Sequence, residues 1–200
     1  MKPMFRTLFL LKRLVMTCSF AMAVVGAAAA PTSAPTDATT PPPFVRDALV
    51  GAALAGEGQM RFLGLRVYDA RLWVGERFDA ADFGSYPLAL ELTYHRAFTG
   101  AAIAQRSIEE IERQGKVASG KTEDWKKSLV SIFPDIQPGD RLTGLYEPGK
   151  GMRLWHASQS VGVIDDPELA RRFFGIWLSS RTSEPGLRSA LLSRKPGAGS

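Results

Sequence analysis

Residues 59–74 read QMRFLGLRVYDARLWV and give the strongest indication of the fold. Aliphatic, aromatic and polar side chains are interleaved, a pattern typical of a strand, and Gly64 in the middle predicts a bulge or a bend. Residues 87–96, PLALELTYHR, alternate more strictly. This spacing places on one face of a strand the side chains Leu88, Leu90, Leu92, Tyr94 and, at its end, Arg96.

Helices and further strands are predicted on the C-terminal side of these stretches. Thr99 can cap a helix that breaks at residues 115–120, and a second helix begins at Thr122 and ends at Pro134. Strands are also predicted at 141–147, 152–157 and 161–164, and helices at 167–180 and 185–192. This order predicts an α+β fold, an antiparallel β-sheet with helices packed on one face.

The first thirty residues have the three parts of a secretory signal. Basic residues come first, residues 14–30 follow without a charge, and small residues at 27–29 offer an A-x-A cleavage pattern. Residues 1–30 are therefore predicted to be a signal peptide that is removed near Ala30, and the protein is expected to be periplasmic or secreted. The alternative is an uncleaved anchor, but this apolar run is at the short limit for crossing a bilayer. We expect no transmembrane segment after cleavage.

Residues 31–43, PTSAPTDATTPPP, follow as a proline-rich linker, and their lack of periodicity predicts disorder. Residues 44–195 have the size of one domain and are predicted to fold as one. The only cysteine, Cys18, leaves with the signal, so the domain must be stabilised by a hydrophobic core instead of disulfides.

The charge of the chain gives no reason to expect a nucleic-acid partner. The full sequence has 25 basic and 20 acidic residues and a net charge of +5. Four of the basic residues lie in the predicted signal, so the remaining chain is close to neutral. Nucleic-acid binding needs clustered positive charge, which is absent from this sequence.

Two familiar chemical patterns are incomplete. Residues 115–122, GKVASGKT, match the phosphate-binding pattern G-x-x-x-x-G-K-[ST], but a helical pattern precedes them where a nucleotide site needs a buried strand. No nucleotide is therefore expected. The two histidines, His95 and His156, have no cysteine or acidic cluster at ligand spacing, so we expect neither a metal nor another cofactor. His95 lies on the polar face of its strand and is expected to be solvated.

Arginines and tyrosines on the predicted strands are the best candidates for a ligand site. An arginine at the mouth of an apolar cavity can hold a carboxylate or a phenolate, and a tyrosine hydroxyl can orient the same group. The alternative is that these are amphipathic sheet residues with their polar ends in water. The predicted ligand-binding residues are Arg61, Tyr68, Tyr94 and Arg96.

Several segments are distinctive in their order and spacing. They are residues 56–73 (GEGQMRFLGLRVYDARLW), 98–100 (FTG), 139–140 (GD), 146–149 (YEPG) and 173–178 (FFGIWL). Together they resemble bacterial exported chalcone isomerase-like domains over residues 51–192. The resemblance implies the chalcone isomerase fold, with a ligand cleft between the antiparallel sheet and its helices. It does not by itself imply the reaction.

The resemblance also allows the catalytic positions to be compared. Plant enzymes of this family close a chalcone to a flavanone with arginine, threonine, tyrosine and asparagine side chains that bind the substrate and polarise its ketone. Leu63, Ile103 and Glu110 occupy the positions of the threonine, tyrosine and asparagine, and Arg61 is the nearest candidate for the arginine. Losing donors that stabilise developing charge would remove most of the rate enhancement.

Three functions stay open. The leading hypothesis is a non-catalytic protein that binds a small amphipathic ligand, a fatty acid or an aromatic acid, between sheet and helices, as some family members bind fatty acids. The first alternative is an isomerase or intramolecular lyase on another substrate, with Arg61 and Tyr68 or Tyr94 as polar groups. The second is a periplasmic interaction domain without a ligand. An apolar cleft between the helices of residues 99–133 and the sheet would favour binding.

Overall fold

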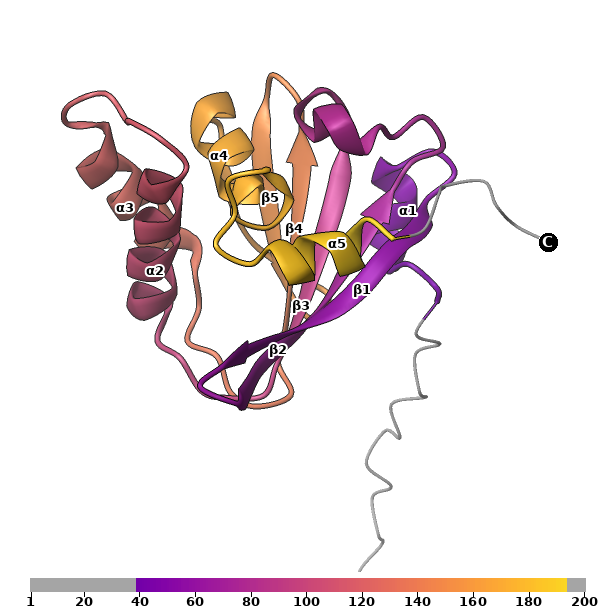
Figure 1. The fold of residues 1–200 in the computed structure, drawn as a ribbon, viewed down its shortest axis with the longest axis horizontal. Coiled ribbons are helices and arrows are strands. Elements are labelled where there is room, and N and C mark those ends of the chain that lie inside the picture. Colours follow the sequence, from indigo (N-terminus) through magenta and orange to yellow (C-terminus); the bar gives the residue numbers. More distant parts are fainter. Residues whose placement is uncertain (1–38, 194–200) are drawn as a thin grey trace, which may run out of the picture. The chain divides into compact units, whose positions relative to one another are not determined.

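The structure is a computed structural model, and it describes residues 39–193. The predicted signal peptide, residues 1–30, and most of the predicted linker, residues 31–43, lie outside the described residues, so both stay predictions. The described part consists of one six-stranded sheet, five α-helices and a short 3-10 helix, η1 (Ala80–Ser85) (Figure 1).

All six strands pair antiparallel with their neighbours in the chain. They are β1 (Ala53–Phe62), β2 (Leu65–Val74), β3 (Leu88–Tyr94), β4 (Arg141–Glu147), β5 (Gly151–His156) and β6 (Gln159–Ile164). The order across the sheet equals the order in the sequence, and helices α2 and α3 separate only β3 from β4. This arrangement confirms the predicted antiparallel sheet.

The single strand predicted at residues 59–74 is in fact a hairpin. The chain reverses at Leu63 and Gly64, whose φ angles are 49° and 79°, and Phe62 pairs with Leu65 across the turn. A two-residue turn that joins antiparallel strands commonly needs positive φ at both central positions. Gly64 therefore belongs to a turn between two strands, and the prediction of a bulge or bend within one strand is wrong.

The alternation predicted for residues 87–96 is confirmed in β3. The side chains that β3 buries in the main core are Leu88, Leu90, Leu92 and Tyr94. The opposite face is covered as well, because Glu91 is buried between two arginines. Its carboxylate oxygens lie 3.3 Å from Arg71 Nη1 and 3.8 Å from Arg141 Nη1. Paired in this way, a carboxylate can be tolerated on a buried strand.

The four predicted helices are present, with ends within two residues of the predicted ones. They are α2 (Gly100–Arg113), α3 (Lys121–Ile132), α4 (Pro167–Leu178) and α5 (Pro185–Leu191). Thr99 caps α2, because its Oγ1 accepts the N–H of Ala102 at 3.1 Å. Asp166 caps α4 in the same manner and accepts two backbone N–H groups at 2.9 Å. Such caps satisfy donors that the first helical turn leaves free.

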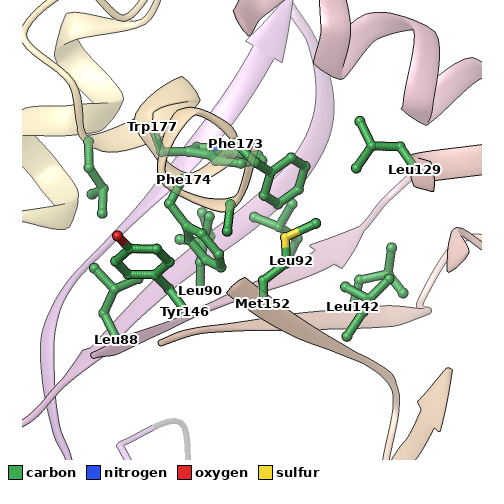
Figure 2. Packing of buried hydrophobic residues seen from close by; sticks show 14 of the residues in the cluster. Leu88, Leu90, Leu92, Leu129, Leu142, Tyr146, Met152, Phe173, Phe174 and Trp177 are labelled. Atoms are coloured by element: carbon green, nitrogen blue, oxygen red, sulfur yellow. The ribbon is translucent and has the colours of Figure 1, made fainter. Parts of the chain in front are cut away.

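The main core lies between the sheet and helices α2–α5. Figure 2 shows Phe173, Phe174 and Trp177 of α4 lying over Leu90 and Leu92 of β3. The rings of Phe173 and Trp177 meet edge to face with centroids 5.4 Å apart. Aromatic side chains bury the largest apolar area of any residue type, so this contact anchors α4 on the sheet.

A smaller core covers part of the other face of the sheet. Helix α1 (Pro43–Ala48), which the sequence did not predict, places Val45 against Trp73 and Trp155. The ring of Phe44 stacks on Trp155 with centroids 4.6 Å apart. The predicted α+β fold with helices packed on one face is confirmed for α2–α5, and α1 adds a short cover to the opposite face.

Candidate ligand-binding cavity

An apolar cavity of about 500 Å³ lies between the sheet and helices α2 and α4. Residues of β1–β5, of both helices and of the segment before α5 form its wall. Its apolar lining includes Leu90, Leu92, Phe98, Ile103, Phe173 and Trp177. The small side chains of Ala102 and Ser107 on α2 also line it, and they leave room between this helix and the sheet. The size and the lining are those of a small-molecule site.

Two of the predicted site residues, Tyr68 and Tyr94, lie side by side in the cavity wall. They pair across β2 and β3, and their rings meet edge to face with centroids 5.7 Å apart. Burial raises the pKa of Tyr68 to about 12 and also raises the pKa of Tyr94. Both phenols are therefore neutral near pH 7 and can donate a hydrogen bond to a ligand.

The hydroxyls of Tyr68 and Tyr94 differ in their hydrogen bonds. The Tyr68 hydroxyl accepts a hydrogen bond from Trp177 Nε1 at 3.0 Å, which fixes its position. Within residues 39–193 the Tyr94 hydroxyl has no hydrogen-bond partner. The Tyr94 hydroxyl is therefore a donor in the cavity wall that a bound polar group can satisfy.

Arg96 stands at the rim of the cavity. It follows β3, lines the cavity and is exposed to solvent. Its guanidinium has no ion pair or hydrogen bond with any residue from 39 to 193. An unpaired guanidinium at the edge of an apolar space is suited to a carboxylate, which it can bind through two parallel hydrogen bonds.

Arg61 does not stand at the cavity mouth, where it was predicted. Its neighbours Met60 and Phe62 both line the cavity, and Arg61 does not. Successive side chains of a strand point to opposite faces, so the strand turns Arg61 away from the cavity. Its Nη1 instead donates to the carbonyl of Gly64 at 3.2 Å on the hairpin surface.

A polar edge on α2 was not among the predicted site residues. Glu110 lines the cavity and is buried, with Arg106 Nη2 2.5 Å from its carboxylate. The hydroxyl of Ser183, in the segment before α5, donates to the same carboxylate at 2.8 Å. The spacing of Arg106 and Glu110, four residues apart on one helix, is the only sequence signal that could have indicated this pair.

Other singled-out residues lie away from the cavity. Residues 115–122 connect α2 to α3, so a helix precedes the glycines as predicted, and Lys121 Nζ pairs with Glu168 at 2.6 Å. His95 is half-buried, with Nε2 2.8 Å from Asp69 Oδ2, so the prediction of a solvated His95 is wrong. The reason is that β2 places Asp69 beside it.

Two further observations concern the described residues alone. No three histidine, cysteine, aspartate or glutamate side chains between residues 39 and 193 come together as a metal site would require. No helix in the same range is long and apolar enough to cross a membrane.

The family model of chalcone isomerase-like proteins matches residues 53–193. The chain belongs to this family. The match covers the whole sheet and helices α2–α5, so it confirms the resemblance to chalcone isomerase-like domains, while export stays a prediction. An uncharacterized protein of Haemophilus influenzae is 31% identical over 109 residues, which make up 54% of this chain and 52% of that protein. The chain therefore matches about half the length of this curated relative.

A solved member of the fold is the crystal structure of a fatty-acid binding protein from Arabidopsis thaliana. It superposes with a TM-score of 0.57 and 14% sequence identity, over 71% of this chain and 87% of that chain. At this identity the similarity concerns the fold. The chalcone isomerase-like architecture of this chain is therefore shown by the family match and by the superposition.

The substituted catalytic positions of this chalcone isomerase-like chain lie in different places. Ile103 and Glu110, the residues that the sequence resemblance matched to the tyrosine and asparagine of the plant enzymes, both line the cavity, and Glu110 is paired with Arg106. Leu63 lies at the hairpin turn, 86% exposed and outside the cavity wall. Among the donors in the wall, the hydroxyls of Tyr68 and Tyr94 and the guanidinium of Arg96 donate to no residue between 39 and 193.

Proposed function

We propose that this protein is an exported, non-catalytic binding protein for a fatty acid or another small amphipathic carboxylate, held between the sheet and helices α2 and α4. The observation that carries the proposal is the apolar cavity of about 500 Å³ with the unpaired Arg96 at its rim. An aliphatic chain or an aromatic ring fits the apolar part, because its transfer from water to such a wall is favourable.

Arg96 and Tyr94 supply the polar end of the site. A carboxylate at the rim would meet the guanidinium of Arg96, and the Tyr94 hydroxyl supplies a neutral donor from the wall. Glu110 does not oppose an anion strongly, because its charge is already matched by Arg106 and its other oxygen by Ser183. The arrangement therefore favours an amphipathic acid over a wholly apolar molecule.

Two comparisons support binding rather than catalysis. The Arabidopsis thaliana protein with the same fold is a fatty-acid binding protein. In this chain, Ile103 and Glu110 replace donors that in the plant enzymes stabilise developing charge. A wall without those donors retains the means to bind an acid but loses the preorganised stabilisation that accelerates a reaction.

Export is the second part of the proposal and depends on residues 1–30. A basic segment, an uncharged apolar segment and an A-x-A pattern support it. Fractionation of the source cells and N-terminal sequencing of the protein should find it outside the cytoplasm, beginning near Ala30. An intact N-terminus on a cytoplasmic protein would contradict export and leave the cavity proposal unaffected.

The ligand is tested by mass spectrometry of what co-purifies with the protein. Native spectra should show an added mass that disappears after delipidation. Titration of the delipidated protein with fatty acids and aromatic acids should then restore it, and the matching methyl esters should bind more weakly. No co-purified molecule and no binding across the panel would overturn the proposal.

A second function, isomerase or intramolecular lyase, is favoured by one observation. Tyr68 and Tyr94 are adjacent neutral phenols in the cavity wall and could polarise a carbonyl group. Arg61 has no part in it, since it does not line the cavity. Turnover of a chalcone panel that disappears in Tyr94→Phe would establish this activity. The third hypothesis, an interaction domain without a ligand, does not account for the apolar cavity.

A further inference from the structure

The tip of the β1–β2 hairpin exposes a compact group of apolar side chains. Phe62 is 60% exposed, Leu63 86% and Leu65 53%. These are three of the six large hydrophobic side chains that are exposed within residues 39–193, and they are confined to four consecutive positions. Single exposed apolar residues need no explanation, but a contiguous group marks a contact surface.

The backbone of the turn holds a leucine in an unfavourable conformation. Leu63 occupies the first central position of a two-residue turn with a φ of 49°. Asparagine or glycine is preferred there, because a larger L-residue is strained at positive φ. The chain therefore holds a leucine at the most exposed point of the hairpin at a cost to local stability, which is a pattern found at functional sites.

Positive charge borders the apolar tip. Arg61 and Arg96 are exposed and have no ion pair within the described chain. Arg66 pairs with Asp69 at 3.1 Å, and this carboxylate also accepts hydrogen bonds from Gln59 and His95. Asp69 is therefore already engaged, and the guanidiniums of Arg61 and Arg96 remain without an acidic partner, Arg61 donating only to the carbonyl of Gly64.

The tip is continuous with the cavity. Phe62 and Leu65 are each more than half exposed, yet both line the cavity, as Arg96 does. In Figure 1 the end of the hairpin lies beside the segment that connects β3 to α2, at the lower edge of the picture. A backbone hydrogen bond of 2.9 Å from His95 to Val67 joins these two segments. The exposed apolar tip therefore forms one side of the cavity mouth.

We propose that the hairpin tip docks on the surface of an anionic phospholipid bilayer. Phe62, Leu63 and Leu65 enter the boundary between headgroups and acyl chains, and Arg61 and Arg96 contact lipid phosphates. Docking in this way places the cavity mouth against the bilayer. The docking surface rests on the exposed side chains of the tip and on the two arginines, and it does not depend on the proposed function.

The chemistry of the tip favours a bilayer over a protein partner. A projecting turn with three apolar side chains between free arginines matches the layered polarity of a lipid surface, apolar inside and phosphate outside. It presents neither a groove nor a flat face to a folded partner. A second copy of this chain would set Arg61 and Arg96 against like charges.

Co-sedimentation with vesicles tests the docking. The delipidated protein is mixed with vesicles of phosphatidylcholine alone, or of phosphatidylcholine and phosphatidylglycerol in equal parts. We expect binding to the anionic vesicles and a decrease with added salt, because the arginine contribution is screened. Leu63→Asn should weaken binding by about tenfold, since it removes an inserted side chain. Arg61→Gln should weaken it by about fivefold.

A matched control separates the tip from general apolar exposure. Val50 is as exposed as Leu63, at 86%, but lies outside the hairpin. Val50→Asn should therefore leave vesicle binding unchanged. Leu63→Asn is also expected to fold, because asparagine suits the positive φ of this position.

Three results would overturn the proposal. One is equal sedimentation with neutral and anionic vesicles. Another is vesicle binding of Leu63→Asn at the level of the unmodified protein. The third is a change of oligomeric state in Leu63→Asn, measured by light scattering, without any vesicle binding, which would make the tip a contact between copies.

Fatty-acid binding measured without vesicles distinguishes the docking proposal from the proposed binding function. Leu63 and Arg61 do not line the cavity, so their variants should bind a fluorescent fatty acid as tightly as the unmodified protein does. Loss of vesicle binding with intact fatty-acid binding supports docking at the tip. Vesicle binding without any fatty-acid binding would contradict the proposed function and leave the docking surface standing.

Discussion

Trp177 of α4 donates a hydrogen bond of 3.0 Å to the hydroxyl of Tyr68 in β2. Both side chains line the cavity, so this bond joins the helix to the sheet across the cavity wall. It occupies one lone pair of the Tyr68 oxygen and so orients the single hydroxyl proton that Tyr68 can donate. The pair therefore has two roles, one in stability and one in shaping the polar part of the cavity.

The stability role predicts the effect of Tyr68→Phe. The variant leaves the buried indole N–H without an acceptor, at a cost of about 1–3 kcal/mol in the free energy of unfolding. Trp177→Phe in the Tyr68→Phe background should cost less than it does alone, because the bond is already lost. Urea unfolding measures both. Tyr86→Phe is the control, since the Tyr86 ring contacts Phe78 outside the cavity, and equal costs for the two tyrosines would contradict the prediction.

The buried tyrosines make folding sensitive to alkaline pH. Burial raises the pKa of Tyr68 from 10.0 to about 12 and raises that of Tyr94 as well. A raised pKa in the folded state means that stability is complete below pH 10 and falls as the pH rises from 10 toward 12. Each tyrosine contributes a loss of about 1.4 kcal/mol per pH unit.

Urea unfolding at increasing alkaline pH should show this loss, and Tyr94→Phe should make it less steep. Absorbance titration of the native protein provides an independent measurement, since phenolate formation is visible in the ultraviolet. Ionisation of Tyr68 near its ordinary value of 10.0 in the folded protein would contradict the expected burial effect.

Arg96→Ala tests the polar end of the ligand site. Removing a hydrogen-bonded charge partner should weaken the binding of a fatty acid by about tenfold or more. The matching fatty alcohol should bind both forms alike, because it carries no charge for Arg96 to meet. Arg77→Ala is the control, since Arg77 is also exposed but does not line the cavity. Calorimetric titration measures these affinities, and an unchanged acid affinity in Arg96→Ala would place the carboxylate elsewhere.

Gly56→Ala tests the packing of α5 against strand β1. A Cβ at Gly56 would collide with the carbonyl oxygens of Ala190 and Leu191, so α5 must move. We expect a loss of about 1–3 kcal/mol in the free energy of unfolding. Fatty-acid affinity should fall too, because Ser183 before α5 lines the cavity.

Gly186→Ala, in α5 itself, provides the comparison for that variant. A Cβ there meets no atom within 4 Å, so alanine should stabilise the protein by about 0.4–1 kcal/mol through the unfolded state. If the two substitutions changed the free energy of unfolding equally, α5 would tolerate displacement. The close packing at Gly56 would then not contribute to stability.

Elements with strong local signals were predictable. The start of α4 followed from Asp166 as a cap and Pro167 at the first helical position, and the structure has both. Strand β3 followed from its alternation. The β1–β2 hairpin was missed because Leu63 stands where asparagine or glycine would have signalled a turn. Helix α1 was missed because its six residues are too short to show a period and begin at Pro43, within a proline run.

Residues of the candidate site were predictable only where the alternation of side chains along a strand determines which face they occupy. Tyr94 and Arg96 lie two residues apart, so alternation placed both on one face, and both line the cavity. Arg61 was expected at the cavity mouth, but strand alternation brings its neighbours Met60 and Phe62 into the cavity wall and leaves Arg61 outside it. The contact between Ser183 and Glu110 joins segments 73 residues apart in sequence. No local sequence pattern predicts a contact between segments so far apart.

The strand order of the sheet has a consequence for how the protein folds. Every strand pairs with its sequence neighbours, so β1–β2 and β4–β5–β6 need only close short loops. We therefore expect the slow step to be the closure of residues 95–140, which brings β3 to β4, since loop entropy must be lost before those contacts form. Helix α2 lies within that loop, so the cavity wall that it contributes forms only once this closure has taken place.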